Sequence, residues 1–256
     1  GTIPSEQYVL EVLGSIDPTA CHSVRNDICR KIGTQLKDLL YSIYNNLNKK
    51  NEGNFSRKSV GERSLKNLAL NYLLENDETD FFDLALSQLK DSKNMTDAMA
   101  AFSGLMNFAC EHRVEAIDWF YHKWQSEELV VDKWFTAQAL SRLPNTLEEI
   151  KNLTRHRKFD LKNPNRMRSL IGAFCHANQN QFNRLDGKGY ELCATYVLKL
   201  DAINPQLAAR LARAFDSWCK FGEERRLLSE QSLNFIKESN CSKDLREVIN
   251  KILTLS

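Results

Sequence analysis

The amino-acid sequence predicts an all-α fold built from a stack of helix pairs, in the manner of an armadillo or HEAT α-solenoid. Apolar residues recur at helical spacing along most of the 256 residues. Proline (5) and glycine (10) are scarce, so helices meet few interruptions. Strand-like alternation of Val, Ile and Thr is absent. Because no fixed sequence period is visible, the stack is inferred from the succession of short helices and not from repeated sequence.

The first half of the chain predicts short helices joined by polar segments. A helix over 5–13 is followed by one that begins at Asp17-Pro18 and continues to about residue 48, with a break near Gly33. The segment KKNEGNFS at 49–56 is polar and contains glycine, which predicts a loop. Further helices are expected over 59–75, 80–89, 96–108, 112–125 and 132–143.

In the second half, two helix starts share one design, Asn followed by Pro, at Asn163-Pro164 and Asn204-Pro205. The Asn side chain can cap the free N–H groups of the first turn, and Pro suits the first helical position. Apolar stripes at helical spacing follow both starts, at 167, 170, 171 and 174 and at 207, 211, 215 and 218. Between them, DGKG at 186–189 predicts a tight turn that joins two buried helices. The other expected helices are 146–155, 223–237 and 242–253.

The charge balance argues against two classes of partner. The chain has 35 basic and 33 acidic residues and a formal net charge of +2. This near-balance gives no electrostatic case for binding nucleic acid or an anionic membrane surface. No apolar run approaches the roughly 20 residues that a membrane-spanning helix needs. We therefore expect neither a nucleic-acid partner nor a membrane partner.

The seven cysteines are scattered, and no Cys-x-x-Cys pair occurs. Such spacing fits free thiols in a reducing compartment better than a disulfide framework. A cytoplasmic location is therefore expected. The chain begins at Gly1 without an initiator Met, so the existence of a targeting segment upstream is left open.

Aromatic residues gather between residues 119 and 135. Packing between neighbouring helices is the preferred interpretation of this group, and a ligand cage is the alternative. Its members are Trp119, Phe120, Tyr121, Trp124, Trp134 and Phe135.

Several long, non-repetitive stretches resemble a known family. NPNRMRSLIGAF, LDGKGY and NPQLAARLARAF, between residues 163 and 215, are similar to the C-terminal helical domain of bacterial-type aminopeptidase N, a zinc aminopeptidase of the M1 class. PSEQYVLEVLGSIDP, RSLKNLALNYL and LVVDKWFTAQA agree as well, in the same order along the chain. The resemblance spans nearly all of residues 1–256 and implies a single C-terminal domain in which helix pairs form a curved superhelix.

The resemblance also singles out three polar residues near the central stretch. In the family, the C-terminal domain closes over the catalytic domain and lends residues to the substrate cavity. By motif match, Arg168 and Arg210 are the arginines that reach this cavity, and Gln206 helps to wall the pocket for the N-terminal side chain. Guanidinium groups can hold peptide carbonyls or a carboxylate by forked hydrogen bonds. From spacing alone, ion pairs or capping of carbonyls within the domain would be the preferred role for both arginines, and the resemblance reverses this preference.

The zinc motif of the family is missing from the chain. His-Glu-x-x-His places two ligands on one helix face, yet none of the five histidines forms an i, i+4 pair. We therefore expect no cofactor in this chain and place the zinc of the parent enzyme in a catalytic domain upstream. The histidines are interpreted as surface or helix-end residues: His22, His112, His122, His156 and His176.

The resemblance implies a parent enzyme that is a zinc-dependent aminopeptidase and releases single residues from peptide N-termini. This chain would cap its catalytic cavity, restrict access and add substrate contacts, and it would be inactive alone. Its partners would be the catalytic domain of the same polypeptide and peptide substrates. The alternative is a free-standing helical solenoid that binds a protein partner.

Overall fold

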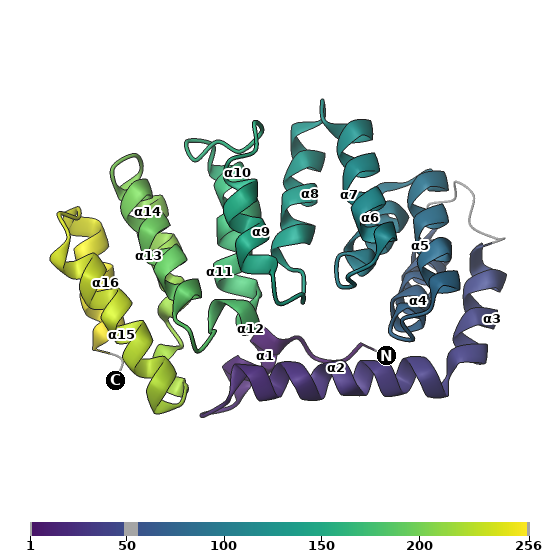
Figure 1. The fold of residues 1–256 in the computed structure, drawn as a ribbon, viewed down its shortest axis with the longest axis horizontal. Helices are drawn as coiled ribbons and strands as arrows, with labels where there is room; N and C mark the ends of the chain where they lie inside the picture. The colour runs from purple at the N-terminus through teal and green to yellow at the C-terminus, as the bar shows by residue number, and fades with distance from the viewer. Residues whose placement is uncertain (1, 49–55, 255–256) are drawn as a thin grey trace. The chain divides into compact units, whose positions relative to one another are not determined.

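The computed structural model describes residues 2–48 and 56–254, and every regular element among them is helical (Figure 1). By their internal contacts, these residues divide into two compact units. The first unit consists of residues 2–3, 24–48 and 56–137, and the second of residues 4–23 and 138–254. Helices α2 (Pro18–Gln35) and α8 (Glu128–Ala139) carry the chain from one unit to the other. All but the last residue of the loop expected at 49–56 lies outside the described residues.

In the first unit, helices that follow one another in the sequence pack together: α3 on α4, α5 on α6, and α6 on α7. Helix α6 also packs on α4. Its core is apolar, with Leu70, Leu73, Phe102 and Leu105 fully buried. The helices are α3 (Lys37–Asn48), α4 (Arg57–Leu74), α5 (Thr79–Asp91), α6 (Met95–Leu105) and α7 (Glu111–Trp124).

The aromatic group of the first unit packs between helices, as the sequence indicates. Phe120 and Phe135 are fully buried, and Phe120 stacks on Phe102 with ring centroids 4.5 Å apart. The indole of Trp134 donates a hydrogen bond of 3.0 Å to the carbonyl of Ile117.

The second unit contains the stretch between residues 163 and 215, with both Asn-Pro helix starts. Helix α13 packs on α14 and α15, and α14 packs on α16. An aromatic cluster forms its centre, with ring centroids of Phe182 5.2 Å from Tyr190 and 5.5 Å from Phe215. The helices are α1 (Glu6–Val12), α9 (Thr146–Leu153), α10 (Pro164–Met167), α11 (Ala173–Ala177), α12 (Gln179–Phe182), α13 (Lys188–Asp201), α14 (Pro205–Ala212), α15 (Glu223–Glu238) and α16 (Lys243–Leu253).

Both Asn-Pro helix starts are confirmed. The side chain of Asn163 accepts hydrogen bonds from the N–H groups of Asn165 and Arg166, and that of Asn204 accepts one from Leu207. The predicted tight turn is confirmed, but it lies two residues earlier, at 184–187, where the N–H of Gly187 donates to the carbonyl of Arg184 and α13 begins at Lys188. Gly187 has a φ of 70°, a conformation that glycine adopts without a steric penalty.

The predicted break near Gly33 is confirmed, although it lies three residues later: α2 ends at Gln35 and α3 begins at Lys37. Gly33 itself allows close packing, since an added Cβ would lie 2.3 Å from the carbonyl oxygen of Tyr72. Two other details of the predicted helices are wrong. The aromatic-rich helix begins at Glu128 and not at residue 132. The two Asn-Pro helices are not joined directly by the 186–189 turn, since α12 and α13 lie between them.

The two apolar stripes extend beyond regular α-helix into irregular helical turns. The stripe after Asn163 includes a π-helical turn over Arg168–Gly172, and the stripe after Asn204 continues past α14 as short 3₁₀ turns, Arg213–Phe215 and Trp218–Lys220. All the predicted stripe residues are nevertheless buried: Met167, Leu170, Ile171, Phe174, Leu207, Leu211, Phe215 and Trp218.

Candidate functional site

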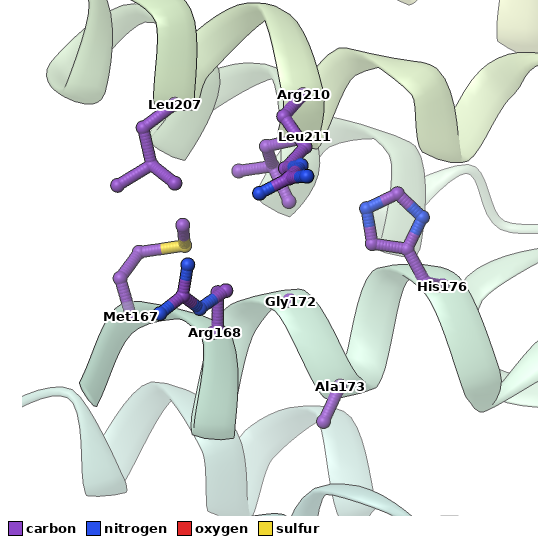
Figure 2. A pocket seen from close by; sticks show the side chains of 8 residues that line it. All are labelled: Met167, Arg168, Gly172, Ala173, His176, Leu207, Arg210 and Leu211. Carbon is purple, nitrogen blue, oxygen red and sulfur yellow. The ribbon is translucent and has the colours of Figure 1, made fainter. Parts of the chain in front are cut away.

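A pocket of about 270 Å³ lies within the second unit, between the helical segment 167–176 and helix α14 (Figure 2). Figure 2 shows the side chains of Arg168 and Arg210 reaching from these two segments into the space between them, with His176 at one side. The lining residues are Met167, Arg168, Gly172, Ala173, His176, Leu207, Arg210 and Leu211.

Local helix geometry positions the two arginines. The cap at Asn163 starts α10, and Arg168 follows as the first residue of the π-helical turn. Single π turns of this kind occur often at functional sites. The guanidinium of Arg168 donates to the side-chain oxygen of Asn165, which restrains its direction. Arg210 lies in the last turn of α14, where a cation also interacts favourably with the helix dipole.

The pocket combines an apolar floor with cationic walls. Met167, Leu207 and Leu211 are buried, whereas both arginine side chains are exposed. Arg210 makes no hydrogen bond or ion pair with any residue that the structure describes, so its five N–H donors are available to a ligand. Such a pocket suits a group that has an apolar part beside a carboxylate or a peptide carbonyl.

His176 contributes the remaining polar side chain of the pocket. Its imidazole is half-buried, and it makes no hydrogen bond within the described part of the chain. Burial lowers the pKa of His176 below its ordinary value, and the charges of Arg210 and Arg213 lower it further against the opposing effect of Asp216. The imidazole is therefore neutral in the empty pocket at pH 7.

The structure brings two of the three sequence-predicted residues together. Arg168 and Arg210 line the same pocket, whereas Gln206 is exposed on α14 outside its lining. Their contact with substrate stays a prediction. Arg166, two residues before Arg168, is almost fully buried. The sequence does not single out His176, although it lies two turns beyond Arg168 and one turn beyond Gly172, on the same side of the segment.

A second pocket, of about 210 Å³, lies within the first unit and has a mostly polar lining. Two of its lining residues form an ion pair, in which the ammonium of Lys66 donates to Asp97 at 2.8 Å, and the amide of Asn67 donates to the same carboxylate at 2.8 Å. Burial alone would raise the pKa of Asp97, but hydrogen bonds from Lys66, Asn94 and Asn67 outweigh it and hold the pKa below its usual value. The carboxylate of Asp97 already has its partners within the protein.

No three metal-ligating side chains converge anywhere in the ranges 2–48 and 56–254. In the same ranges, no helix has both the length and the hydropathy needed to cross a membrane.

Comparison with known proteins places the chain in context. The family model described as "Domain of unknown function (DUF3458_C) ARM repeats" matches residues 2–254. ARM repeats are stacked helical units, so the predicted all-α stack of helix pairs is confirmed.

Curated relatives and one solved structure are aminopeptidases to which this chain is similar. The chain is 36% identical over 254 residues to aminopeptidase N of Escherichia coli (strain K12) and 33% identical over 253 residues to that of Haemophilus influenzae. Each alignment covers 98% of this chain and 29% of the relative. A crystal structure of Legionella pneumophila aminopeptidase A in complex with aspartic acid is 31% identical, with a TM-score of 0.91 over 100% of this chain and 31% of that chain. The predicted resemblance is confirmed, and the chain spans less than a third of the length of these relatives.

Proposed function

We propose that this chain, which belongs to the DUF3458_C family of ARM-repeat domains, is the C-terminal domain of a longer enzyme. The proposed enzyme is an aminopeptidase that removes N-terminal residues from peptides. The observation that carries the proposal is the pocket of the second unit. It presents two guanidinium groups beside an apolar floor, which matches a peptide's combination of carbonyl or carboxylate oxygens with side chains.

In the proposed enzyme, Arg168 and Arg210 hold oxygen atoms of the bound peptide, and Gln206 contributes to the wall of the cavity outside this pocket. The domain caps the catalytic cavity and restricts entry to peptides and unfolded chain ends. Its partner is the catalytic region of the same polypeptide. Zinc in that region would activate the water that attacks the peptide bond. Since His-Glu-x-x-His does not occur in this sequence, we expect the chain alone not to hydrolyse aminoacyl substrates.

Arg210→Ala in the full-length enzyme should lower kcat/KM for tri- and tetrapeptides about ten- to a hundredfold. A hydrogen bond to a charged group contributes about 1.5–3 kcal/mol, and each 1.4 kcal/mol corresponds to a tenfold change. Single-residue chromogenic substrates should be affected less, because they extend less far into the cavity. Steady-state kinetics with both substrate classes measures the difference.

The melting temperature of the same variant is the control. Arg210 makes no hydrogen bond or ion pair within the described residues, so its removal should leave thermal stability within a few degrees of the parent value. A variant that unfolds early and, when folded, cleaves long and short substrates at parental rates would assign Arg210 to the scaffold.

The natural coding sequence upstream of Gly1 tests the enzyme assignment itself. A His-Glu-x-x-His motif followed by a further Glu is expected there. Its absence would leave the alternative function, a free-standing helical solenoid that binds a protein partner.

A further inference from the structure

The imidazole of His176 lines the pocket of the second unit, and neither of its ring nitrogens makes a hydrogen bond to another described residue. A neutral imidazole has one donor and one acceptor, and both are available here to a ligand. Figure 2 shows its ring beside the space that Arg168 and Arg210 enter from the two helical segments. The three side chains thus border one volume of about 270 Å³.

We propose that His176 is a third peptide-binding residue of this pocket and that it donates a hydrogen bond to a carboxylate of the peptide held by Arg168 and Arg210. The inference rests on the proposed function and names one substrate feature, a free carboxylate beside an apolar side chain. The apolar part would lie on Met167, Leu207 and Leu211, which form the buried floor.

The charges that face His176 make its protonation depend on the ligand. Arg210 on α14 and Arg213 on the following 3₁₀ turn oppose an imidazolium, and Asp216 favours one. The carboxylate of Asp216 is engaged at 2.9 Å by Arg213, so the two charges offset each other in part. On its own segment, Arg168 is the charged group of the same pocket. In the empty pocket, burial and the two arginines together lower the pKa of His176.

A carboxylate in the pocket reverses this balance, because it neutralises the arginines and accepts from the imidazolium. The pKa of His176 is then higher in the complex than in the empty pocket. By linkage, binding of a carboxylate strengthens as the pH falls through the raised pKa of the complex, whereas binding of an uncharged amide does not. The pocket should therefore prefer a peptide with a C-terminal carboxylate over the same peptide with a C-terminal amide more strongly at pH 6 than at pH 8.

The kinetic test uses the full-length enzyme and matched peptide pairs that differ only in a C-terminal carboxylate or amide, such as Ala-Ala-Leu and its amide. The ratio of their kcat/KM values cancels the pH dependence that both substrates share. We expect this ratio to rise about three- to tenfold from pH 8 to pH 6, because one unit of pKa change corresponds to a tenfold change in affinity. His176→Gln should retain binding through the arginines and lose this rise.

His156→Gln is the matched control. His156 is also half-buried and also has a lowered pKa, caused by burial and by Arg157, Arg166 and Lys158, but it does not line the pocket. Its replacement should leave the ratio and its pH dependence unchanged.

A direct measurement on the 256-residue chain needs no catalysis. The imidazole signals of His176 are followed by NMR from pH 5 to pH 8 with saturating N-acetyl-Ala-Leu or its amide, saturation being judged from the Arg210 side-chain signals. The acid should raise the pKa of His176, and the amide should not. Equal titration with both peptides, or a pH-dependent ratio that persists in His176→Gln, would overturn the inference. Arg210→Ala with unchanged peptide hydrolysis would instead overturn the proposed function, so the two failures are distinguishable.

Discussion

Lys66→Met should destabilise the first unit by about 3–5 kcal/mol, the cost of leaving a buried charge without its partner. The side chains of Lys66 and Asp97 are 4% and 5% exposed, and their charged groups lie 2.8 Å apart. Methionine preserves most of the volume and removes the ammonium, so the carboxylate of Asp97 stays buried with only amide donors. Chemical denaturation of the variant and the parent measures the difference.

Two further variants separate burial from charge. Lys37→Met removes the ammonium of a pair of similar geometry, with 2.6 Å between Lys37 and Glu78, but those side chains are 39% and 45% exposed. Because solvent screens such a pair, the cost should stay below about 1 kcal/mol. Adding Asp97→Asn to Lys66→Met removes the uncompensated charge and should recover part of the loss. A loss of less than about 1 kcal/mol for Lys66→Met would show that solvent reaches the pair.

The pH dependence of stability gives an independent check on Asp97. Its pKa in the folded protein lies below the ordinary value of 3.8, so its contribution is present above pH 4 and is lost as the pH falls through the lowered pKa. Lys66→Met removes the strongest hydrogen-bonding partner, so the pKa of Asp97 should rise in the variant. The stability difference between variant and parent should therefore shrink as the pH falls from 7 towards 4.

Local sequence patterns are sufficient to predict the helices that begin with an Asn cap followed by Pro. Asn163 and Asn204 cap the helices that they were expected to cap, and the stripe residues Met167 and Leu207 are buried. Capping and periodicity act over three to seven residues, so they can be read without knowing the tertiary structure. The same holds for the turn at Gly187, whose backbone angle only glycine adopts readily.

Features that depend on remote partners could not be predicted in this way. Lys66 and Asp97 are 31 residues apart, and nothing in either segment indicates that they meet. Arg166 follows a helix cap on a polar stretch, yet tertiary packing buries it. The π-helical turn that starts at Arg168 likewise cannot be predicted, because the apolar stripe around it keeps ordinary helical spacing. The pocket that His176 lines is completed by α14, which begins about 30 residues later in the chain.

Gly189→Ala should destabilise the second unit by about 3 kcal/mol, the upper end of the usual cost of overpacking. Gly189 lies in the first turn of α13, and a Cβ added there would lie 2.2 Å from the carbonyl oxygen of Phe182 and 2.8 Å from that of Gln181. Both obstacles are backbone atoms at the end of α12, so they cannot rotate aside as a side chain can. Relief requires α13 to move, and Tyr190 and Phe182 would then lose their packing in the aromatic cluster.

Gly61→Ala is the same chemical change, but it should raise the stability of the protein where Gly189→Ala lowers it. Gly61 is exposed within α4, and a Cβ at this position meets nothing within 4 Å. Alanine should therefore stabilise the chain by about 0.5–1 kcal/mol, because it restricts the unfolded backbone and favours the helix. Thermal and denaturant unfolding of the two variants side by side tests the packing of α13 on α12. If Gly189→Ala were as harmless as Gly61→Ala, the start of α13 would have to lie further from Phe182 than the structure places it.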